Sequence, residues 1–273
     1  MKKVFILLIA GFVLVFAEYA IFCNFSSAET TAADVMKSVW QDIYPDGLRN
    51  EVVFSQEFGG EERDVGMWID HTSRSALIFI GNYETSRKRF DRRSGGTLYL
   101  EDDNPFDYRV YVVREVGRRA RVKEKAVGTL QAKANGTQLN YFDIVRAVEP
   151  ENPDDFEFSF IEKEDSAWQI KATPKYQISG DYDHRIFSIY ETEDSKRVIG
   201  SVGYFQAGSQ VKTKLNSGFS QCKSNGSHFW RPDKIIVSTE EGATELAVIK
   251  RSFNVNFGEL SEKDLKRGTP GSW

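Results

Sequence analysis

The sequence predicts a mainly β protein built around a large antiparallel sheet with few helices. The first observation is that residues 185–257 form a series of alternating runs with no helical period between them, and alternation is typical of half-buried strands. The second is that turn residues separate these runs. The third is the abundance of aromatic residues, 20 Phe, 11 Tyr and 5 Trp, which strands favour. The turns lie at Asp194-Ser195, Ala207-Gly208, Asn225-Gly226 and Glu241-Gly242.

The amino-terminal segment has the form of a secretory signal. Lys2 and Lys3 precede an apolar run, Val4–Ala17, that is shorter than the ~20 residues a membrane-spanning helix needs. We predict a signal peptide over residues 1–28 and a single β domain over 29–273, in the periplasm. Cleavage after Ala17, an uncleaved anchor, and lipid anchoring at Cys23 are the alternatives. Lipid anchoring is disfavoured because Phe22 stands where a small residue is needed.

One long helix is expected over Thr31–Tyr44. Thr31 can cap it, with Asp34 three residues later in the capping-box position. Apolar residues recur at three- and four-residue spacing through Trp40, and Pro45-Asp46-Gly47 ends the pattern. The helix therefore packs on a sheet, and it can also close a concavity of that sheet.

Strand patterns continue on both sides of one long irregular segment. That segment, residues 128–148, is predicted to be a loop with a short helix, and long loops in compact domains are often functional. A helical turn begun by Ser261 is predicted near the carboxyl terminus. The alternating runs are Glu51–Phe58, Arg63–Asp70, Arg74–Ile80, Glu84–Phe90, Thr97–Leu100, Tyr108–Arg114, Arg118–Lys125, Asp154–Glu164, Trp168–Ala172, Tyr176–Ser179, Arg185–Glu191, Arg197–Gln206, Ser209–Leu215, Trp230–Thr239 and Thr244–Val255.

The sequence lacks the patterns that carry catalysis. It has three histidines, His71, His184 and His228, and none of the common zinc-protease, serine-hydrolase or nucleotide-binding motifs. Two of the histidines follow aspartates at predicted turns, where both residue types are ordinary. Cys222 has no nearby cysteine partner. We therefore expect no enzyme activity, no cofactor and no metal site.

A basic cluster stands out in this acidic protein. Residues 85–125 contain twelve Lys or Arg and seven Asp or Glu, a net charge of +5. If 118–125 is a strand, Arg119, Arg121, Lys123 and Lys125 project from one side of it. This side is either an ordinary solvated face or a docking face for lipid headgroups or a membrane partner. Nucleic acid is not expected as a partner, because an exported protein rarely meets it.

Several short blocks resemble the LolA-like family of outer-membrane lipoprotein-sorting proteins, in particular its stand-alone periplasmic branch, which is often associated with hydrophobe exporters. Two departures from the family pattern are the missing proline near Tyr108–Val112 and the longer loop at 128–146. The matching blocks are the helix Ala33–Tyr44, the sequence Gly95-Gly96-Thr97-Leu98-Tyr99-Leu100, the segment Asn140–Ile144, the hairpin Val202–Lys212 and the stretch Phe229–Ile235.

The resemblance implies an open half-barrel of about eleven antiparallel strands wrapped around a helical lid. It further implies a non-enzymatic, monomeric carrier for lipid or lipoprotein acyl chains, with an inner-membrane hydrophobe exporter as a partner. The alternative is a periplasmic interaction or sensor module that docks onto a membrane transporter or regulator without cargo. Alternation predicts which side chains point inward, as ligand-cavity lining or as plain core: Trp40, Met67, Ile69, Ile78, Ile80, Tyr99, Tyr111, Phe158, Phe160, Phe187, Ile189 and Val248.

Overall fold

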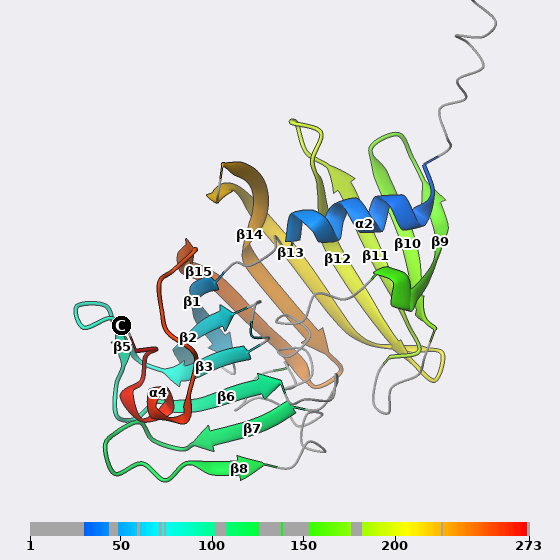
Figure 1. Ribbon diagram of the computed structural model, residues 1–273. Coiled ribbons are helices and arrows are strands. Elements are labelled where there is room, and N and C mark those ends of the chain that lie inside the picture. The colour runs from blue at the N-terminus through cyan, green and yellow to red at the C-terminus, as the bar shows by residue number, and fades with distance from the viewer. Residues whose placement is uncertain are drawn as a thin grey trace, which may run out of the picture.

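The structure is a computed structural model, shown in Figure 1. It describes residues 30–43, 49–58, 61–70, 73, 75–101, 108–125, 138, 153–175, 182–224 and 226–271. Within these ranges the helices are α2 (Ala32–Ile43) and α4 (Glu262–Arg267), with a single 3-10 turn, η2 (Pro153–Asp155). The strands are β1 (Arg49–Phe58), β2 (Glu61–Asp70), β3 (Ser75–Gly81), β4 (Tyr83–Glu84), β5 (Arg89–Phe90), β6 (Gly95–Glu101), β7 (Tyr108–Val113), β8 (Lys123–Lys125), β9 (Phe156–Lys163), β10 (Ala167–Pro174), β11 (His184–Glu191), β12 (Arg197–Gln206), β13 (Ser209–Ser224), β14 (Ser227–Thr239) and β15 (Gly242–Phe253).

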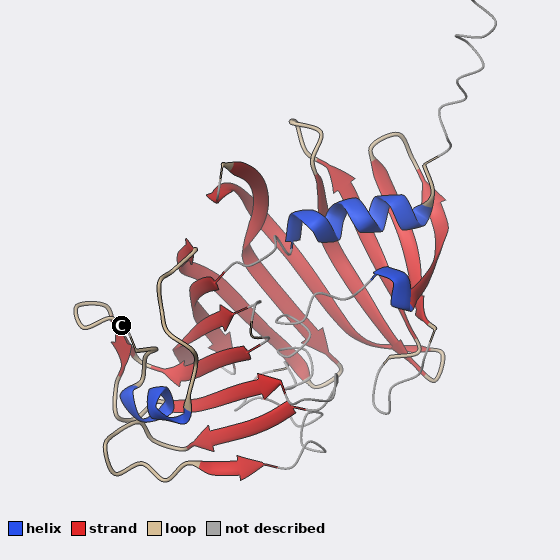
Figure 2. Ribbon diagram, in the orientation of Figure 1, coloured by secondary structure: helices blue, strands red, loops and turns tan. Residues whose placement is uncertain are grey.

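Thirteen of the described strands form one antiparallel sheet in the order β8-β7-β6-β3-β2-β1-β15-β14-β13-β12-β11-β10-β9. Two meanders therefore meet where β1 pairs with β15, and the small β4-β5 hairpin stands apart. Strands β8 and β9 are the two edges, so the sheet does not close on itself (Figure 2). The predicted open antiparallel sheet with few helices is confirmed.

The seam between the two meanders joins residues far apart in the chain. Lys250 donates a hydrogen bond to the carboxylate of Glu51, with 2.7 Å between Nζ and Oε2. Val53 is fully buried in the same strand pair, where the register shifts between Val53 and Phe54. The N-terminal strands are thus held to the C-terminal strands by a continuous ladder rather than by a linker.

Helix α2 begins as the sequence predicts. The Oδ2 atom of Asp34 accepts hydrogen bonds from the backbone nitrogen of Thr31 at 3.0 Å and from its hydroxyl at 2.6 Å. The backbone nitrogen of Asp34 donates to the same hydroxyl at 3.2 Å. This reciprocal pair is a capping box. Val35, Met36 and Val39 on the apolar face are fully buried or nearly so.

The buried apolar residues form three clusters. The helix cluster joins α2 to β9–β12, including Phe187 and Ile189. The strand cluster spans β1–β3, β6, β7 and β15, including Ile78 and Tyr99. The outer cluster lies under α4 and the residues before it, including Phe79. Ser261 is the N-cap residue of α4 and forms a capping box with Asp264, so the helix starts where it was predicted, and Gly268 is its C-cap.

Three predicted strands differ from the structure in extent: turns shorten or divide two of them, and one continues past its predicted end. The prediction of a strand over Arg118–Lys125 is wrong in extent, since Ala120 donates to the Gly117 carbonyl at 2.9 Å and only β8 pairs. The run Glu84–Phe90 folds back on itself as β4 and β5. Strand β13 continues past its predicted end, through Gly218 with a φ of 62°. The predicted strand Tyr176–Ser179, the signal segment 1–28 and, apart from Gln138, the long loop lie outside the described residues.

Candidate functional site

The helix cluster and the strand cluster lie on the same face of the sheet. Residues directly opposite one another on antiparallel neighbours project from the same face, so the face can be followed across the strands. Leu246, two residues after Thr244 on β15, belongs to the strand cluster. We call this face, on which α2 packs, the inner face. The row of facing residues that connects the clusters is Phe187, Val202, Lys214, Val237 and Thr244.

Eleven of the twelve predicted inward residues are on the inner face, in two groups. Those in the helix cluster are Trp40, Phe158, Phe160, Phe187 and Ile189. Those in the strand cluster are Met67, Ile69, Ile78, Ile80, Tyr99 and Val248. The twelfth, Tyr111, packs against the outer cluster. That assignment is wrong because Val110 and Val112, its neighbours on β7, take the inner positions.

Trp40 is the centre of the aromatic packing under α2. Its ring meets the rings of Phe156, Phe158 and Phe187 edge to face, with centroids 5.8, 5.6 and 6.2 Å apart. Such edge-to-face pairs are favourable beyond the area that they bury. Phe158 and Phe160, which belong to β9 and pack against the helix cluster, are only partly buried. The helix is therefore seated on a layer of rings, some of which still present apolar surface.

The long segment predicted as a loop touches the inner face at Gln138. Its backbone nitrogen donates to the hydroxyl of Thr244 at 2.9 Å, and its side-chain oxygen accepts from Thr239 at 2.8 Å. Gln138 is buried. This contact joins residue 138 to the ends of β14 and β15, between the two apolar clusters.

Two buried cations on the inner face were not among the predicted site residues. Arg185 and Lys212 occupy the same alternating positions as Phe187 and Lys214, their neighbours two residues on along β11 and β13. Only 4% of Arg185 and 7% of Lys212 is exposed. The strand period alone would have placed both on this face. Burial of the charges could not be read from the sequence, because it depends on what covers the strands.

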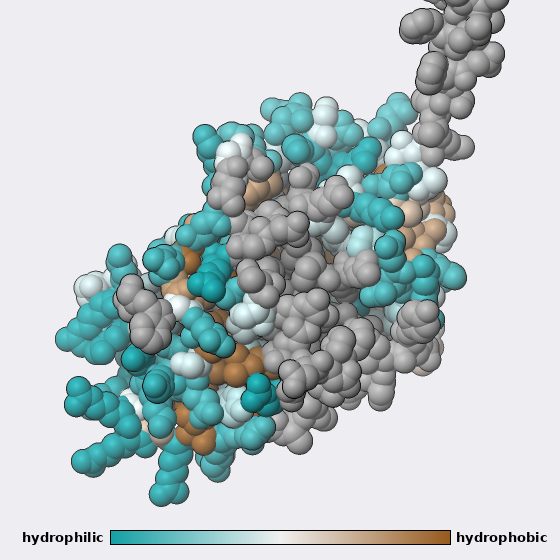
Figure 3. Space-filling model, viewed as in Figure 1, coloured by the Kyte–Doolittle hydropathy of each residue, from teal (hydrophilic) through white to brown (hydrophobic). Residues whose placement is uncertain are grey.

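The predicted basic face does not exist as one side of a strand. Arg119 lies in a turn, Arg121 precedes β8, and Lys123 begins it. All three are exposed, and the side chain of Lys125 is outside the described residues. Figure 3 shows long hydrophilic side chains projecting from the end of the molecule near β8, and hydrophobic side chains at the surface over β6 and β7. The basic residues are thus a solvent-exposed group at one sheet edge.

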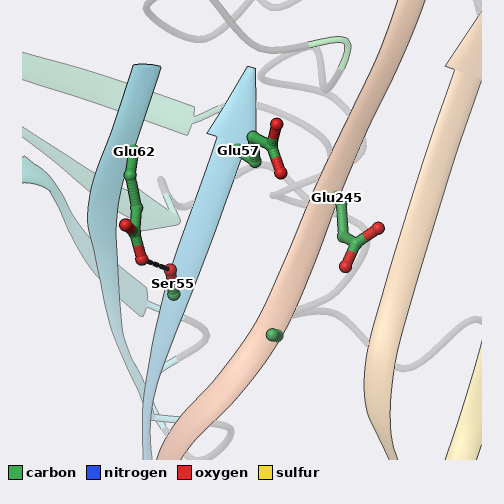
Figure 4. Close-up of a pocket in the computed structure, with 5 residues that line it drawn as sticks. Ser55, Glu57, Glu62 and Glu245 are labelled. Carbon is green, nitrogen blue, oxygen red and sulfur yellow. Dashed lines mark hydrogen bonds between the residues drawn. The ribbon is translucent and has the colours of Figure 1, made fainter. Parts of the chain in front are cut away.

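A shallow acidic groove lies on the opposite, outer face (Figure 4). It has a volume of about 330 Å³ and is lined by residues of β1, β2 and β15: Ser55, Glu57, Glu62, Glu245 and Ala247. The hydroxyl of Ser55 donates to Glu62 at 2.8 Å, and Lys234 pairs with Glu245 at 2.6 Å. Among the described residues, no group of His, Cys, Asp or Glu has the arrangement of a metal site. The groove is a polar surface on the opposite side of β1 and β15 from the strand cluster, because Ser55 and Ala247 alternate with the cluster residues Phe54 and Leu246 along these strands.

The described histidines and the cysteine do not assemble into a reactive group. His184 stacks on Phe205, with ring centroids 4.5 Å apart, and burial is the main cause that lowers its pKa below 6.5. His228 is exposed on β14. The thiol of Cys222, which is free and partly buried, lies 3.9 Å from a guanidinium nitrogen of Arg251. His71 lies outside the described residues.

No protein-family model matches this sequence, and a search of curated proteins finds no match. Solved structures do match. A DUF1329 family protein from Desulfovibrio piger superposes with a TM-score of 0.61 at 15% identity, over 86% of this chain and 95% of that chain. An outer membrane lipoprotein-sorting protein domain from Vibrio parahaemolyticus gives 0.60 at 12% identity, over 86% and 96% of the two chains. A LolA superfamily protein from Nitrosomonas europaea gives 0.54 at 13% identity, over 86% and 97%.

These superpositions cover most of each chain at low sequence identity. They show that this chain has a LolA-like fold, and they confirm the predicted resemblance at the level of the fold. Among the residues that the structure describes, no helix has the length and apolar character needed to cross a membrane.

Proposed function

We propose that this protein is an exported, non-enzymatic carrier that binds a hydrophobic ligand, such as an acyl chain of a lipid or lipoprotein, along the inner face of its sheet. The observation that carries the proposal is that two apolar clusters share one face of an open sheet. On both clusters part of the apolar surface is accessible: Met67, Ile69, Ile80, Phe158, Phe160 and Val248 are only partly buried. The likeness to a lipoprotein-sorting protein domain supports the same class of ligand.

The energetics of an acyl chain explain why such a carrier is needed. Each CH₂ group costs about 0.8 kcal/mol to hold in water, so a chain of about 16 carbons costs on the order of 13 kcal/mol. Free diffusion of such a chain through an aqueous compartment is therefore negligible. A carrier offsets this cost with an apolar surface and releases its cargo when the cover over that surface moves. An inner-membrane hydrophobe exporter is the kind of partner that such a cargo requires.

A second candidate function is the docking module without cargo. It is favoured by the exposed cations Arg118, Arg119, Arg121 and Lys123, which lie close together in sequence at the β8 edge. Such a group suits an anionic membrane surface or an acidic partner. The two functions differ in one observable property, because a docking module does not take up hydrophobic molecules.

Uptake of a fluorescent 16-carbon lipid probe by the purified protein tests the proposal. We expect saturable binding with one site per chain. Met67→Gln and Val248→Gln should each weaken binding about tenfold, the equivalent of ~1.4 kcal/mol, because each places an amide on the apolar inner face. Leu215→Gln is the matched control: Leu215 lies on the outer face and is 46% exposed, so its substitution should leave the affinity within about twofold.

Two results would contradict the proposed carrier function. The first is a wild-type protein that takes up no probe, which would favour the docking module. The second is an equal loss of affinity in all three variants, which would place the probe somewhere other than the inner face. Circular dichroism of each variant confirms that the sheet is intact before affinities are compared.

A further inference from the structure

Three segments that are rich in cations meet at one end of the sheet. The backbone nitrogen of Phe90 donates to the carbonyl of Gly268 at 2.9 Å, and that of Val116 donates to the carbonyl of Ser94 at 3.1 Å. A Cβ atom at Gly268 would lie 2.9 Å from a methyl carbon of Val116. These contacts join the segments at the end of the molecule where β5, α4 and β8 lie in Figure 1. We call this set the basic corner, and its segments are residues 84–94, 114–124 and 262–268.

The basic corner is strongly positive within an acidic protein. Its first segment contains five cations and two carboxylates, its second five and two, and its third three and two. Together these thirteen cations and six carboxylates give a net charge of +7, whereas the whole chain has a formal net charge of −4. All thirteen cations are exposed. The fold therefore gathers positive charge from three separate parts of the sequence onto one exposed surface.

Few of these charges are neutralised within the protein. Among the described residues only Arg87, Arg89 and Arg267 have an ion pair. Glu84 provides the first two pairs, at 3.4 and 3.6 Å. Asp264, which also forms the capping box of α4, provides the third at 3.4 Å. The other ten cations of the basic corner have no carboxylate within ion-pair distance in the part of the chain that the structure describes, so their charge is available to a partner.

The basic corner offers charge without an apolar centre. Its large apolar residues, such as Phe90, Val116 and Leu265, are buried in the outer cluster. Figure 3 shows long hydrophilic side chains projecting into solvent from this end of the molecule. Stable protein interfaces usually have an apolar core, whereas an anionic bilayer attracts clustered cations without one. Among the described residues, the large apolar side chains that are exposed lie elsewhere: Ile161, Tyr190, Leu215 and Ile249.

We propose that the basic corner docks this protein onto a bilayer that contains anionic phospholipids. The inference does not depend on the proposed carrier function. It goes beyond the second candidate function, because two further segments join the cations near β8 and because docking accompanies the binding of cargo rather than replacing it. Each cation held near an anionic surface strengthens binding about fivefold, and salt screens the attraction. Ten unpaired cations on one surface therefore give docking that is strong at low salt and weak at high salt.

Co-sedimentation of the purified protein with lipid vesicles tests the proposal. Vesicles of mixed phosphatidylcholine and phosphatidylglycerol are compared with vesicles of phosphatidylcholine alone. We expect binding to the anionic vesicles to be at least tenfold tighter at about 0.05 M salt, and most of this preference to disappear at about 0.5 M. The neutral vesicles are needed because the apolar run at residues 4–17 can itself bind lipid, and they measure that contribution separately.

Two double variants test whether the segments act as one surface. Arg92→Gln with Arg93→Gln removes two charges from the first segment, and Arg118→Gln with Arg119→Gln removes two from the second. All four side chains are exposed, so both variants are expected to fold, which circular dichroism checks. Each double variant should weaken binding to anionic vesicles at least tenfold and leave binding to neutral vesicles unchanged. An effect in one double variant and none in the other would contradict a single surface.

A matched control separates the basic corner from net charge. Lys175→Gln with Lys223→Gln also removes two exposed cations, but from the other meander, and binding to anionic vesicles should stay within about twofold of the wild-type value. A loss as large as in the arginine variants would overturn the proposal. Met67→Gln, which should weaken uptake of the lipid probe, should dock like the wild type. Failure of the carrier function and failure of docking are therefore distinguishable.

Polyglutamate is the probe for the other kind of anionic partner, an acidic protein. We expect the wild type to bind anionic vesicles more tightly than polyglutamate at equal concentrations of negative charge. If it binds polyglutamate but shows no preference for anionic over neutral vesicles, the basic corner belongs to an acidic protein and membrane docking is overturned. Equal binding to both kinds of vesicle without binding to polyglutamate would overturn any role of the basic corner in docking.

Discussion

Gly96 shows how closely the outer face of the sheet is packed. A Cβ atom at this position of β6 would lie 2.5 Å from a ring carbon of Phe79 and 3.1 Å from a methyl group of Leu265. Both neighbours are fully buried, so neither can move into solvent. The residue is therefore small because α4 and β3 pack on it, and not because the backbone needs an unusual conformation.

We expect Gly96→Ala to lower the free energy of unfolding by about 1–3 kcal/mol, the usual cost of overpacking a core. Urea denaturation measures this value. Gly200→Ala is the control: its Cβ would meet the ring of Tyr190 at 2.8 Å, but Tyr190 is 38% exposed and can turn outward. A Gly200 variant as unstable as the Gly96 variant would contradict this explanation.

At the same scale, eleven of the twelve residues predicted from alternation share one face of the sheet, and Tyr111 lies on the other face. Tyr111 has the same character as Tyr99, yet the two rings lie on opposite faces of the sheet. A strand with large apolar residues on both faces, such as β7, does not reveal which face is inner. Arg185 and Lys212 were not among the predicted site residues because a charged residue in an alternating run is ordinarily expected to face solvent, whatever face the alternation gives it.

Helix α2 depends on an ionised capping residue. The hydrogen bond from the Thr31 hydroxyl is the main cause that holds the pKa of Asp34 below its ordinary value of 3.8. A lowered pKa in the folded state means that the folded protein binds this proton less readily than the unfolded chain. The contribution of Asp34 to stability is therefore complete above pH 4 and is lost as the pH falls through the folded-state pKa.

The comparison of wild type with Asp34→Ala by urea denaturation from pH 7 to pH 2.5 tests this dependence. We expect the wild type to be more stable at neutral pH and the difference to shrink at the acid end. Asp34→Asn keeps an acceptor oxygen but cannot titrate, so its difference from Asp34→Ala should stay constant across the range. A wild-type advantage that persists undiminished at pH 2.5 would show that the charge of Asp34 is irrelevant.

The elements were predictable where local signals agree. The capping box of α2 was visible as Thr31 with Asp34, and the start of α4 was visible as Ser261 before a helical pattern. The extents of β8 and β13 were not predictable, because a strand continues only while a neighbour pairs with it. Gly218 looks like a terminator in sequence, yet pairing with β14 carries β13 past it.

At the scale of the whole molecule, the continuous sheet predicts a single cooperative domain. The pairing of β1 with β15 connects residues such as Glu51 and Lys250, and loss of this ladder would remove support from both meanders. Domains joined by a continuous sheet unfold together, whereas domains joined by a linker can unfold separately.

Two single-tryptophan variants test the prediction. One retains only Trp68 on β2, the other only Trp168 on β10, and both residues are buried. We expect the fluorescence of each variant to report a single unfolding transition. The urea midpoints of the two variants should agree once the effect of the tryptophan substitutions on the stability of each variant is subtracted. Val53→Ala at the seam, which should cost about 1–3 kcal/mol, should move both midpoints together. Two separate midpoints, or a seam variant that shifts only one, would show two domains.

The sequence by itself determined the class of the fold, because the strand period, the turn residues and the helix caps are local properties of the chain. It also indicated which apolar residues alternate inward and that the motifs of common enzymes are missing. The tertiary structure alone decided that β1 pairs with β15, that α2 packs on the β9–β12 end, and that the two apolar clusters share one face. Pairing and coverage depend on residues far apart in the chain, and the same long-range packing converts two ordinary-looking cations, Arg185 and Lys212, into buried charges beside an apolar surface.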